Sequence, residues 1–397
     1  MKKINFLPLI LLLPAFLPLL HGQLANVYPH DLGIETDPAV LYVEKFEDGM
    51  ANILSRYQDK KNTAGMSLNA DVPPGSTGLF SLRMTNVGGV NSGGHLYKKF
   101  APGWDSTVYV RYYVKYPSIS QGYIHHESIW FGGYNPATPW PNPQAGTCGL
   151  GDSRISIAYE PVSLATMNTY LYWGDMQHDP NGNCWGNVMI KGSLVPAAIP
   201  YDEWLCVEVM LKLNNPVSAS NGELRVWHNG VEAGYWGPGF PNGSWTWDKF
   251  IVDAAGPPFP GFRWRTDPDL NINYIWIEYY DDQSPAGVSH YIQYDHLVVA
   301  TKPIGPISNA SSLNVLREAE PSFRVDPNPA TDQMTLTLAK AAPGATLFLY
   351  NALGELIQTF ELSAPVTTVD ISSLRPGIYM LGVQSGSKIA YRKFIKA

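Results

Sequence analysis

The sequence predicts an all-β protein of two domains, a two-sheet sandwich of jelly-roll type followed by a small immunoglobulin-like sandwich. Short runs with strand character alternate with Asn-Gly and Pro-containing turns, and helical periodicity is nearly absent. The 12 Trp and 23 Tyr favour strands, whereas the 36 Gly and 33 Pro favour turns. Because 397 residues exceed what one core of ordinary size organises, two domains are expected.

The composition excludes several function classes. Hydrophobic residues make up 45% of the chain and charged residues only 15%, which excludes a disordered polyelectrolyte. The formal charge of -7 gives no basic field that would attract nucleic acid or anionic membranes. We therefore expect no nucleic-acid partner, and we expect a monomer.

The first residues have the pattern of a secretory signal peptide, which we place at residues 1–22. Lys2 and Lys3 precede an apolar run that Pro8, Pro14 and Pro18 interrupt, so a retained anchor is disfavoured. No later segment is long and apolar enough to span a bilayer. Residues 23–39 are expected to be irregular.

The main domain is placed at residues 40–307. Its clearest predicted strands are residues 108–115, 154–159, 205–213, 224–227, 274–279 and 293–301. Cys148 and Cys184 lie in Gly-rich loops and could form one disulfide in an oxidising compartment, whereas Cys206 is expected in a strand as a free thiol. No cysteine spacing resembles a zinc site.

A polar linker, residues 308–320, leads to a smaller all-β unit at residues 321–397. Four motifs mark this unit, at residues 323–329, 347–354, 369–379 and 391–396. In this order they resemble the type A sorting domain of the type IX secretion system of Bacteroidota. The resemblance implies translocation across the outer membrane by that secretion machinery, removal of the tail, and release or attachment at the cell surface.

Strand alternation suggests one candidate groove. Tyr109, Arg111 and Tyr113 share the face opposite the apolar residues of their strand. A polar and aromatic face suits a saccharide groove, but a solvated outer face gives the same pattern.

Further cations, imidazoles and phenols follow along the chain. They are His125, His126, Arg154, Ser156, Tyr170, Tyr172, Lys212, Arg263 and Arg265. Such a set could perform β-elimination on a uronic acid. A cation neutralises the carboxylate at C5, a His or Tyr removes the C5 proton, and a Tyr protonates the leaving oxygen.

The layout of residues 96–301 is similar to concanavalin-like jelly-roll polysaccharide lyases, chiefly families 14 and 20, which include alginate and glucuronan lyases. The motifs that carry this resemblance are Trp130-Phe131-Gly132-Gly133, Arg154 with Ser156, Tyr170-Leu171-Tyr172, Trp204 with Glu208, the turn from Asn214 to Gly222, and Tyr294 to Val299. The resemblance implies catalytic roles for Tyr170 and Tyr172. We predict the catalytic residues to be His125, His126, Arg154, Tyr170 and Tyr172. The predicted substrate-binding residues are Tyr109, Arg111, Tyr113, Ser156, Lys212, Arg263 and Arg265. Two departures from the family pattern are present. The catalytic Lys that the family has in the strand before Gly-Gly is absent, and His125 and His126 lie at that place. The family's Ser-x-Arg order is reversed in Arg154 and Ser156.

Several of these candidate site residues could instead have a purely structural role. A Tyr-x-Tyr strand is commonly core packing, and Arg263 and Arg265 could simply pair with Asp267 and Asp269. Neighbouring residues of a strand point to opposite faces, so at most one of His125 and His126 would face a groove.

We therefore predict a secreted polysaccharide lyase that cleaves a uronate-containing extracellular polysaccharide, such as alginate or glucuronan, by metal-independent β-elimination. A carbohydrate-binding surface protein is the main alternative. A glycoside hydrolase is disfavoured because the Glu-x-Asp-x-x-Glu strand of jelly-roll glucanases is missing. No cofactor is expected, although a structural calcium ion would be compatible with such folds.

Overall fold

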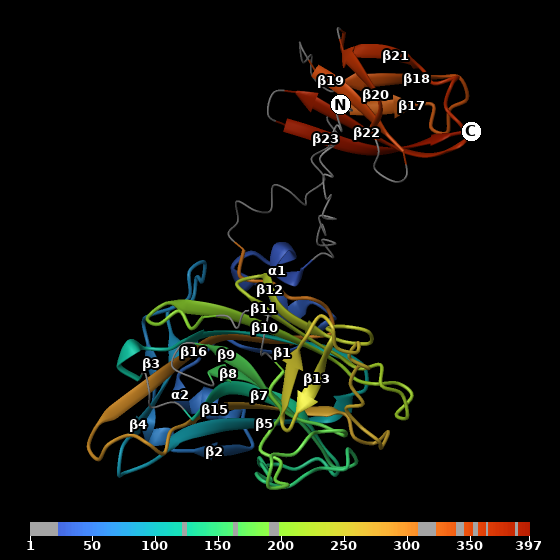
Figure 1. The fold of residues 1–397 in the computed structure, drawn as a ribbon. Coiled ribbons are helices and arrows are strands. Elements are labelled where there is room, and N and C mark those ends of the chain that lie inside the picture. The colour runs from blue at the N-terminus through green and yellow to red at the C-terminus, as the bar shows by residue number, and fades with distance from the viewer. Residues whose placement is uncertain are drawn as a thin grey trace, which may run out of the picture. The chain divides into compact units, whose positions relative to one another are not determined.

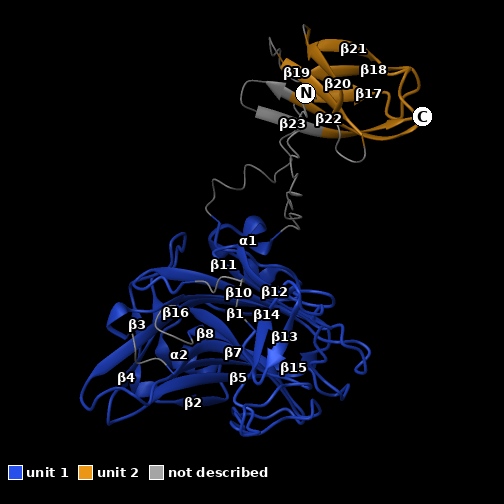
Figure 2. Cartoon of the chain, in the orientation of Figure 1, with its two compact units in different colours: residues 1–309 blue, residues 310–397 orange. Residues whose placement is uncertain are grey.

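The computed structural model describes residues 23–120, 125–161, 166–189, 198–308, 323–338, 345–351, 356–362, 364–385 and 388–397. The predicted signal peptide and residues 309–320 of the predicted linker lie outside these described residues. The chain divides into two compact units, Met1–Asn309 and Ala310–Ala397 (Figure 2).

The first unit is a sandwich of two antiparallel sheets (Figure 1). One sheet has eight strands in the order β12-β11-β10-β6-β16-β4-β3, with β1 also paired to β16. These strands are β1 (Val40–Glu44), β3 (Met66–Asn69), β4 (Ser81–Val87), β6 (Thr107–Lys115), β10 (Trp204–Lys212), β11 (Glu223–His228), β12 (Val231–Trp236) and β16 (Ser289–Ala300).

The second sheet has six strands in the order β2-β5-β15-β7-β8-β9. They are β2 (Asp59–Lys61), β5 (Gly93–Trp104), β7 (His126–Tyr134), β8 (Arg154–Pro161), β9 (Met167–Tyr172) and β15 (Ile272–Tyr280). A separate hairpin pairs β13 (Gly243–Thr246) with β14 (Lys249–Val252). Helix α2 (Met50–Ser55) and the 3-10 turns η3 (Thr63–Gly65) and η4 (Ser118–Ser120) connect strands.

The main core lies between the two sheets, and the period-2 alternation of the strands fills it. Val110 and Tyr112 of β6 meet Ile155 and Ile157 of β8 there, all nearly inaccessible to solvent. Each of the predicted strands falls on an observed strand, so the predicted all-β sandwich is confirmed.

Residues 23–39 are more ordered than their irregular sequence suggested. They contain α1 (Leu24–Val27), η1 (Pro29–Asp31) and η2 (Ile34–Thr36). We call Leu24–Thr36 the N-terminal cover, because Leu24 and Ile34 pack against Val298 and Ala300 on the outer face of the eight-stranded sheet.

The second unit is a small sandwich with its own core. A three-stranded sheet contains β17 (Phe323–Asp326), β18 (Gln333–Leu338) and β21 (Val366–Asp370). A four-stranded sheet contains β19 (Ala345–Tyr350), β20 (Leu356–Leu362), β22 (Gly377–Ser385) and β23 (Lys388–Lys396). Leu336, Leu347 and Phe394 belong to the core of this unit, which shares no residue with the core of the first unit.

Every helix among the described residues is too short or too polar to cross a lipid bilayer.

Candidate functional site

The strongest candidate site lies on the face of the six-stranded sheet that is turned away from the main core, which we call the aromatic face. Its buried aromatic cluster consists of Tyr97, Trp130, Tyr134, Tyr172, Tyr274 and Trp276, with Ala158 among them and Tyr170 packed against it. Alternation produces this face, since Ile129 and Phe131 of the same strand β7 point into the main core while Trp130 points out.

Four of the predicted catalytic residues form one continuous row on this face. The ring centroids of His126 and Tyr170 are 5.1 Å apart, and those of Tyr170 and Tyr172 are 5.7 Å apart. The guanidinium carbon of Arg154 lies 3.7 Å from the centre of the Tyr172 ring. Strands β7, β8 and β9 contribute to the row and are adjacent in the sheet, so their pairing places an imidazole, two phenols and a guanidinium side by side.

The His126 imidazole is held by an acidic neighbour. Its Nδ1 lies 2.8 Å from Oε1 of Glu160, which is almost fully buried. Burial alone would lower the pKa of His126, but the charge of Glu160 and its hydrogen bond to the ring outweigh burial and raise that pKa to about 9. His126 is therefore a cation at neutral pH, which suits charge neutralisation and does not suit a general base.

The two phenols have different environments, although burial raises the pKa of both. The hydrogen bond between them raises the pKa of Tyr170 further and lowers that of Tyr172. Arg154 also lowers the pKa of Tyr172 by its charge and by a hydrogen bond. Tyr172 is thus the phenol whose ionised form is better supported, and Tyr170 is the phenol that stays protonated.

Arg154 is fixed by its own contacts. Its Nε donates to Ser156 Oγ at 3.0 Å, and its Nη1 donates to the carbonyl oxygen of Pro143. Ser156 Oγ also accepts from the Tyr274 hydroxyl at 2.6 Å. Ser156, a predicted substrate-binding residue, therefore helps to hold the guanidinium over Tyr172.

Two loop segments pack around this row. Gly186 lies so close to the Tyr170 ring that a Cβ there would approach a ring carbon to 2.4 Å, and Asn187 pairs with Leu171 at the edge of β9. The predicted disulfide between Cys148 and Cys184 is present and joins the loop after β7 to this segment. Tyr172 is only 4% exposed, so little of its surface is accessible between these segments.

His125 differs from its expected orientation. Alternation predicted that His125 and His126 would point to opposite faces, but their rings stack with centroids 4.5 Å apart. The reason is that β7 begins at His126, so His125 precedes the strand and is not bound by its alternation. His125 Nδ1 lies 3.1 Å from Asp282 Oδ1 at the exposed end of the row.

The predicted groove on β6 is wrong. Tyr109, Arg111 and Tyr113 lie on the outer face of the eight-stranded sheet, beneath the N-terminal cover and the segment after β16. Arg111 has no solvent exposure, and its Nη2 is 2.6 Å from Asp31 Oδ2. The polar face of this strand binds the protein's own N-terminal segment, which alternation could not reveal.

Three other predicted substrate-binding cations also lie outside the row. Lys212 is on the eight-stranded sheet and pairs with Glu223 at 2.6 Å. Arg265 is buried and donates to Asp105 and to two backbone carbonyls, so it holds a turn. Arg263 pairs with Asp175, three residues beyond β9. The two arginines do form ion pairs, as the alternative interpretation expected, but with Asp175 and Asp105 and not with Asp267 and Asp269.

Sequence reasoning missed the acidic and Trp residues of the site. Glu160 and Glu278 come from β8 and β15, the two neighbours of β7 in the sheet, and influence the His126 charge from both sides. Trp130 contacts His126, Tyr170 and Trp276. Trp130 could have been identified from the sequence, because it alternates with Phe131 and so points away from the core. The two carboxylates could not, because only the order of the strands in the sheet brings Glu160 and Glu278 to His126.

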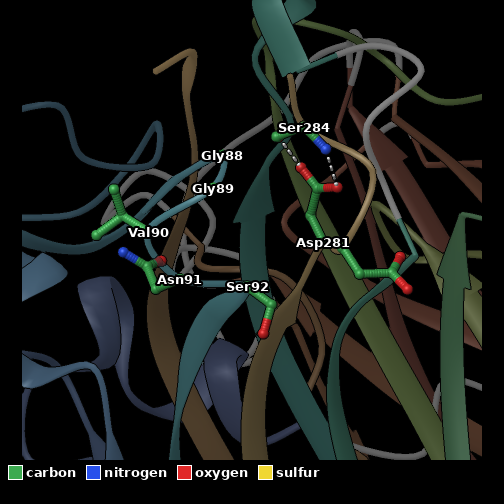
Figure 3. Close-up of a pocket in the computed structure, with 8 residues that line it drawn as sticks. Gly88, Gly89, Val90, Asn91, Ser92, Asp281 and Ser284 are labelled. Atoms are coloured by element: carbon green, nitrogen blue, oxygen red, sulfur yellow. Dashed lines mark hydrogen bonds between the residues drawn. The ribbon is translucent and has the colours of Figure 1, made fainter. Parts of the chain in front are cut away.

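A separate open depression lies where β4 turns into β5 and where β15 ends (Figure 3). Its lining includes Gly88, Asn91, Asp281 and Ser284. The Asp281 carboxylate accepts from the backbone and hydroxyl of Ser284 and from the backbone of Gln283, as two dashed lines in Figure 3 show in part. The Asp281 carboxylate therefore has hydrogen-bond donors within its own turn. None of the predicted catalytic residues lines the depression.

Comparison with known families identifies the second unit. Residues 324–397 match the family described as secretion system C-terminal sorting domain. This confirms the predicted sorting domain, and the protein is directed by type IX secretion to the outside of the cell or to the outer-membrane surface. No curated protein matches the chain.

Solved structures with low similarity to this chain include two alginate lyases and a glucanase. A double mutant of alginate lyase Aly36B in complex with an alginate tetrasaccharide is 14% identical, covers 68% of this chain and 99% of its own, and has a TM-score of 0.41. Alginate lyase vAL-1 from Chlorella virus is 13% identical, covers 66% of this chain and 100% of its own, and has a TM-score of 0.38. Endo-1,3-beta-glucanase from Streptomyces sioyaensis is 12% identical, with 67% and 96% covered and a TM-score of 0.34.

Proposed function

We propose that this protein is an extracellular polysaccharide lyase that cleaves a uronate-containing chain by β-elimination. The observation that carries the proposal is the row of His126, Tyr170, Tyr172 and Arg154 on one sheet face. It combines two cations with two phenols whose environments push their pKa values apart. These are the groups that β-elimination requires, and they act without a metal in the proposed mechanism.

In this mechanism the imidazolium of His126 and the guanidinium of Arg154 pair with the substrate carboxylate. Neutralising the carboxylate makes the proton at C5 more acidic. The ionised form of Tyr172, a minor species at neutral pH because burial raises its pKa, takes that proton with the support of the Arg154 cation. The C5–H electrons then form the C4–C5 double bond, and the C4–O bond breaks. Tyr170 gives its proton to the leaving oxygen. The hydrogen bond between the phenols then returns a proton from Tyr172 to Tyr170 and restores the starting state.

The test is the ultraviolet absorbance of the unsaturated uronate that elimination creates, measured on alginate, glucuronan, pectate and glycosaminoglycans. Wild-type protein is expected to produce it on one polymer. Tyr172→Phe should lower kcat/KM by roughly 100-fold or more, because general acid–base groups contribute about 10²–10⁴-fold. Tyr235→Phe, a tyrosine of the eight-stranded sheet, is the matched control and should keep full activity.

One observation favours a second candidate, a glycoside hydrolase. Burial raises the pKa of Glu278 to about 8, so it is protonated at neutral pH while Glu160 pairs with the His126 cation. An acid and a carboxylate on either side of one strand can act as a hydrolytic pair. New reducing ends without the absorbance, abolished by Glu278→Gln, would establish hydrolysis and contradict elimination.

A third outcome would favour a binding module. Retention on one polymer in affinity electrophoresis, with neither product formed, would show that the face recognises saccharide without cleaving it. Stacking on sugars needs accessible aromatic faces, and Trp130 and Trp276 are little exposed; the similar burial of Tyr172 places the same demand on cleavage.

A further inference from the structure

A second constellation lies on the other side of the sandwich, on the outer face of the eight-stranded sheet. His296 Nε2 is 2.8 Å from Ser76 Oγ, and His296 Nδ1 is 2.8 Å from Asp31 Oδ2. Asp31 belongs to the N-terminal cover, Ser76 to the loop between β3 and β4, and His296 to β16. Three segments that are distant in sequence thus converge on one hydrogen-bonded chain.

We propose that Ser76, His296 and Asp31 form a catalytic triad that hydrolyses carboxylic esters, at a site independent of the aromatic face. The order hydroxyl, imidazole, carboxylate and the two short contacts are those that activate a serine nucleophile. Asp31 and His296 are buried, whereas Ser76 is only partly buried. This distribution keeps the orienting groups in place and leaves the nucleophile toward the surface.

The charges fix the direction of both hydrogen bonds. Burial would raise the pKa of Asp31, but Arg111 and His296 lower it to about 2, so the carboxylate is ionised. An ionised Asp31 accepts from Nδ1–H of His296. Burial lowers the pKa of His296, so the ring is neutral and its Nε2 is free of a proton. Nε2 therefore accepts from the Ser76 hydroxyl, which is the tautomer a general base needs.

Strained backbone is concentrated at this constellation. His30, Asp31 and His296 are non-glycine residues with φ values of 57°, 56° and 47°. Left-handed conformations of such residues cluster at functional sites, because the surrounding contacts must enforce them. Here the strain places the Asp31 carboxylate and the His296 ring on the same side of the sheet.

The neighbouring backbone offers an oxyanion hole that the protein itself fills. The amides of Leu79 and Phe80 both donate to Glu47 Oε1, at 3.0 and 3.1 Å. A Cβ added to Gly78 would lie 2.3 Å from that oxygen and 3.1 Å from Ser76 Oγ, so the oxygen and the hydroxyl are close neighbours. Two amides converging on one oxygen beside a serine stabilise an acyl oxyanion. We infer that Glu47 masks the triad and that an ester carbonyl oxygen must replace its carboxylate.

The reaction balances with water as the only co-reactant. Ser76 Oγ attacks the ester carbonyl carbon and its proton passes to His296 Nε2, which then protonates the departing alcohol. Water next attacks the acyl-serine and gives a proton to His296. The C–O bond to Ser76 breaks, the carboxylic acid leaves, and Ser76 regains its proton from the imidazolium.

The test uses the full mature chain, a fluorophosphonate probe and p-nitrophenyl acetate. Wild-type protein should label slowly at Ser76, as mapped by peptide mass spectrometry. Glu47→Ala, or Glu47→Ser if the first variant does not fold, should raise labelling and ester hydrolysis at least 10-fold. Glu47→Gln keeps an oxygen for the two amides and should stay near wild type.

Ser76→Ala and His296→Gln should abolish both signals, whereas Thr77→Ala, a change at the exposed neighbour, should leave them unchanged. Tyr172→Phe should also keep ester hydrolysis, so failure of the polysaccharide lyase and failure of the triad are distinguishable. The triad is overturned if folded wild-type and Glu47-substituted proteins both remain unlabelled, or if labelling persists in Ser76→Ala.

Discussion

At the scale of single residues, the local environment gives side chains of the same type different charges and pKa values. Tyr170 and Tyr172 are two residues apart, yet the Arg154 cation acts mainly on Tyr172. His125 and His126 are adjacent, yet only His126 contacts a nearly buried carboxylate. Position relative to a neighbouring charge, and not residue type, sets which group donates a proton and which carries charge.

The charge of His126 has a pH signature. Its pKa is raised from 6.5 to about 9 in the folded state, so the charged form stabilises the fold. That stabilisation is complete below about pH 6.5 and is lost as pH rises through about 9. We expect urea unfolding to show that the imidazole contributes a decrease of roughly 3 kcal/mol across this window.

His126→Gln should remove the part of this dependence that comes from the imidazole, whereas His125→Gln, at the exposed neighbour, should preserve it. Polysaccharide cleavage should fall in the same alkaline window, because the neutral imidazole no longer pairs with the substrate carboxylate. An unfolding free energy that is flat between the two pKa values in wild type would contradict the prediction.

Replacing Arg111 should reduce stability without affecting the candidate site. Arg111→Met keeps a long side chain but leaves the buried carboxylate of Asp31 without its arginine partner. Loss of one member of a buried ion pair typically costs about 3–5 kcal/mol, so the melting temperature should drop strongly. Cleavage of polysaccharide by the folded fraction should be unchanged, and a selective loss of kcat would show that Arg111 belongs to the site after all.

At the scale of elements, the aromatic face depends on loops that the Cys148–Cys184 disulfide ties together. The bond closes a loop with a sequence separation of 36 residues, for which chain entropy predicts about 4 kcal/mol. Replacing both cysteines by serine should lower the free energy of unfolding by roughly 2–4 kcal/mol.

The same double replacement should also alter KM, because the segment around Gly186 packs on Tyr170. Cys206→Ser is the control for thiol chemistry, since Cys206 is a buried free cysteine of the other sheet. Unchanged denaturation curves for the double variant would mean that the loops are held by their remaining contacts.

At the scale of the whole molecule, each unit has a separate hydrophobic core. A chain limited to residues 23–308 should therefore fold, unfold in one cooperative transition, and retain its polysaccharide activity within about twofold. Circular dichroism and the absorbance assay on the truncated and the full chain test this.

In cells, deleting residues 324–397 should leave the protein inside the outer membrane, because those residues carry the sorting signal. Fractionation with antibody detection measures the distribution. Equal amounts at the surface with and without the tail would contradict the assignment of export to this unit.

The sequence by itself determined the strands and the sorting tail. Both depend on local patterns, namely period-2 alternation, turn residues and short motifs, so β6, β8, β10 and β15 fall within a residue or two of their predicted bounds. The sequence also predicted the Tyr-x-Tyr pair and Arg154 as site residues from the patterns of their own strands, and the structure places them in contact.

Only the tertiary structure decided which polar face serves the site. The outward residues of β6 and of β8 look alike in sequence, but the N-terminal cover buries the first set, while the second set faces Tyr170 and Tyr172. Strand order, which no local pattern encodes, placed Glu160 and Glu278 on either side of His126. It also brought Asp31 and Ser76 to His296, because long-range contacts assemble residues that the sequence keeps more than 200 positions apart.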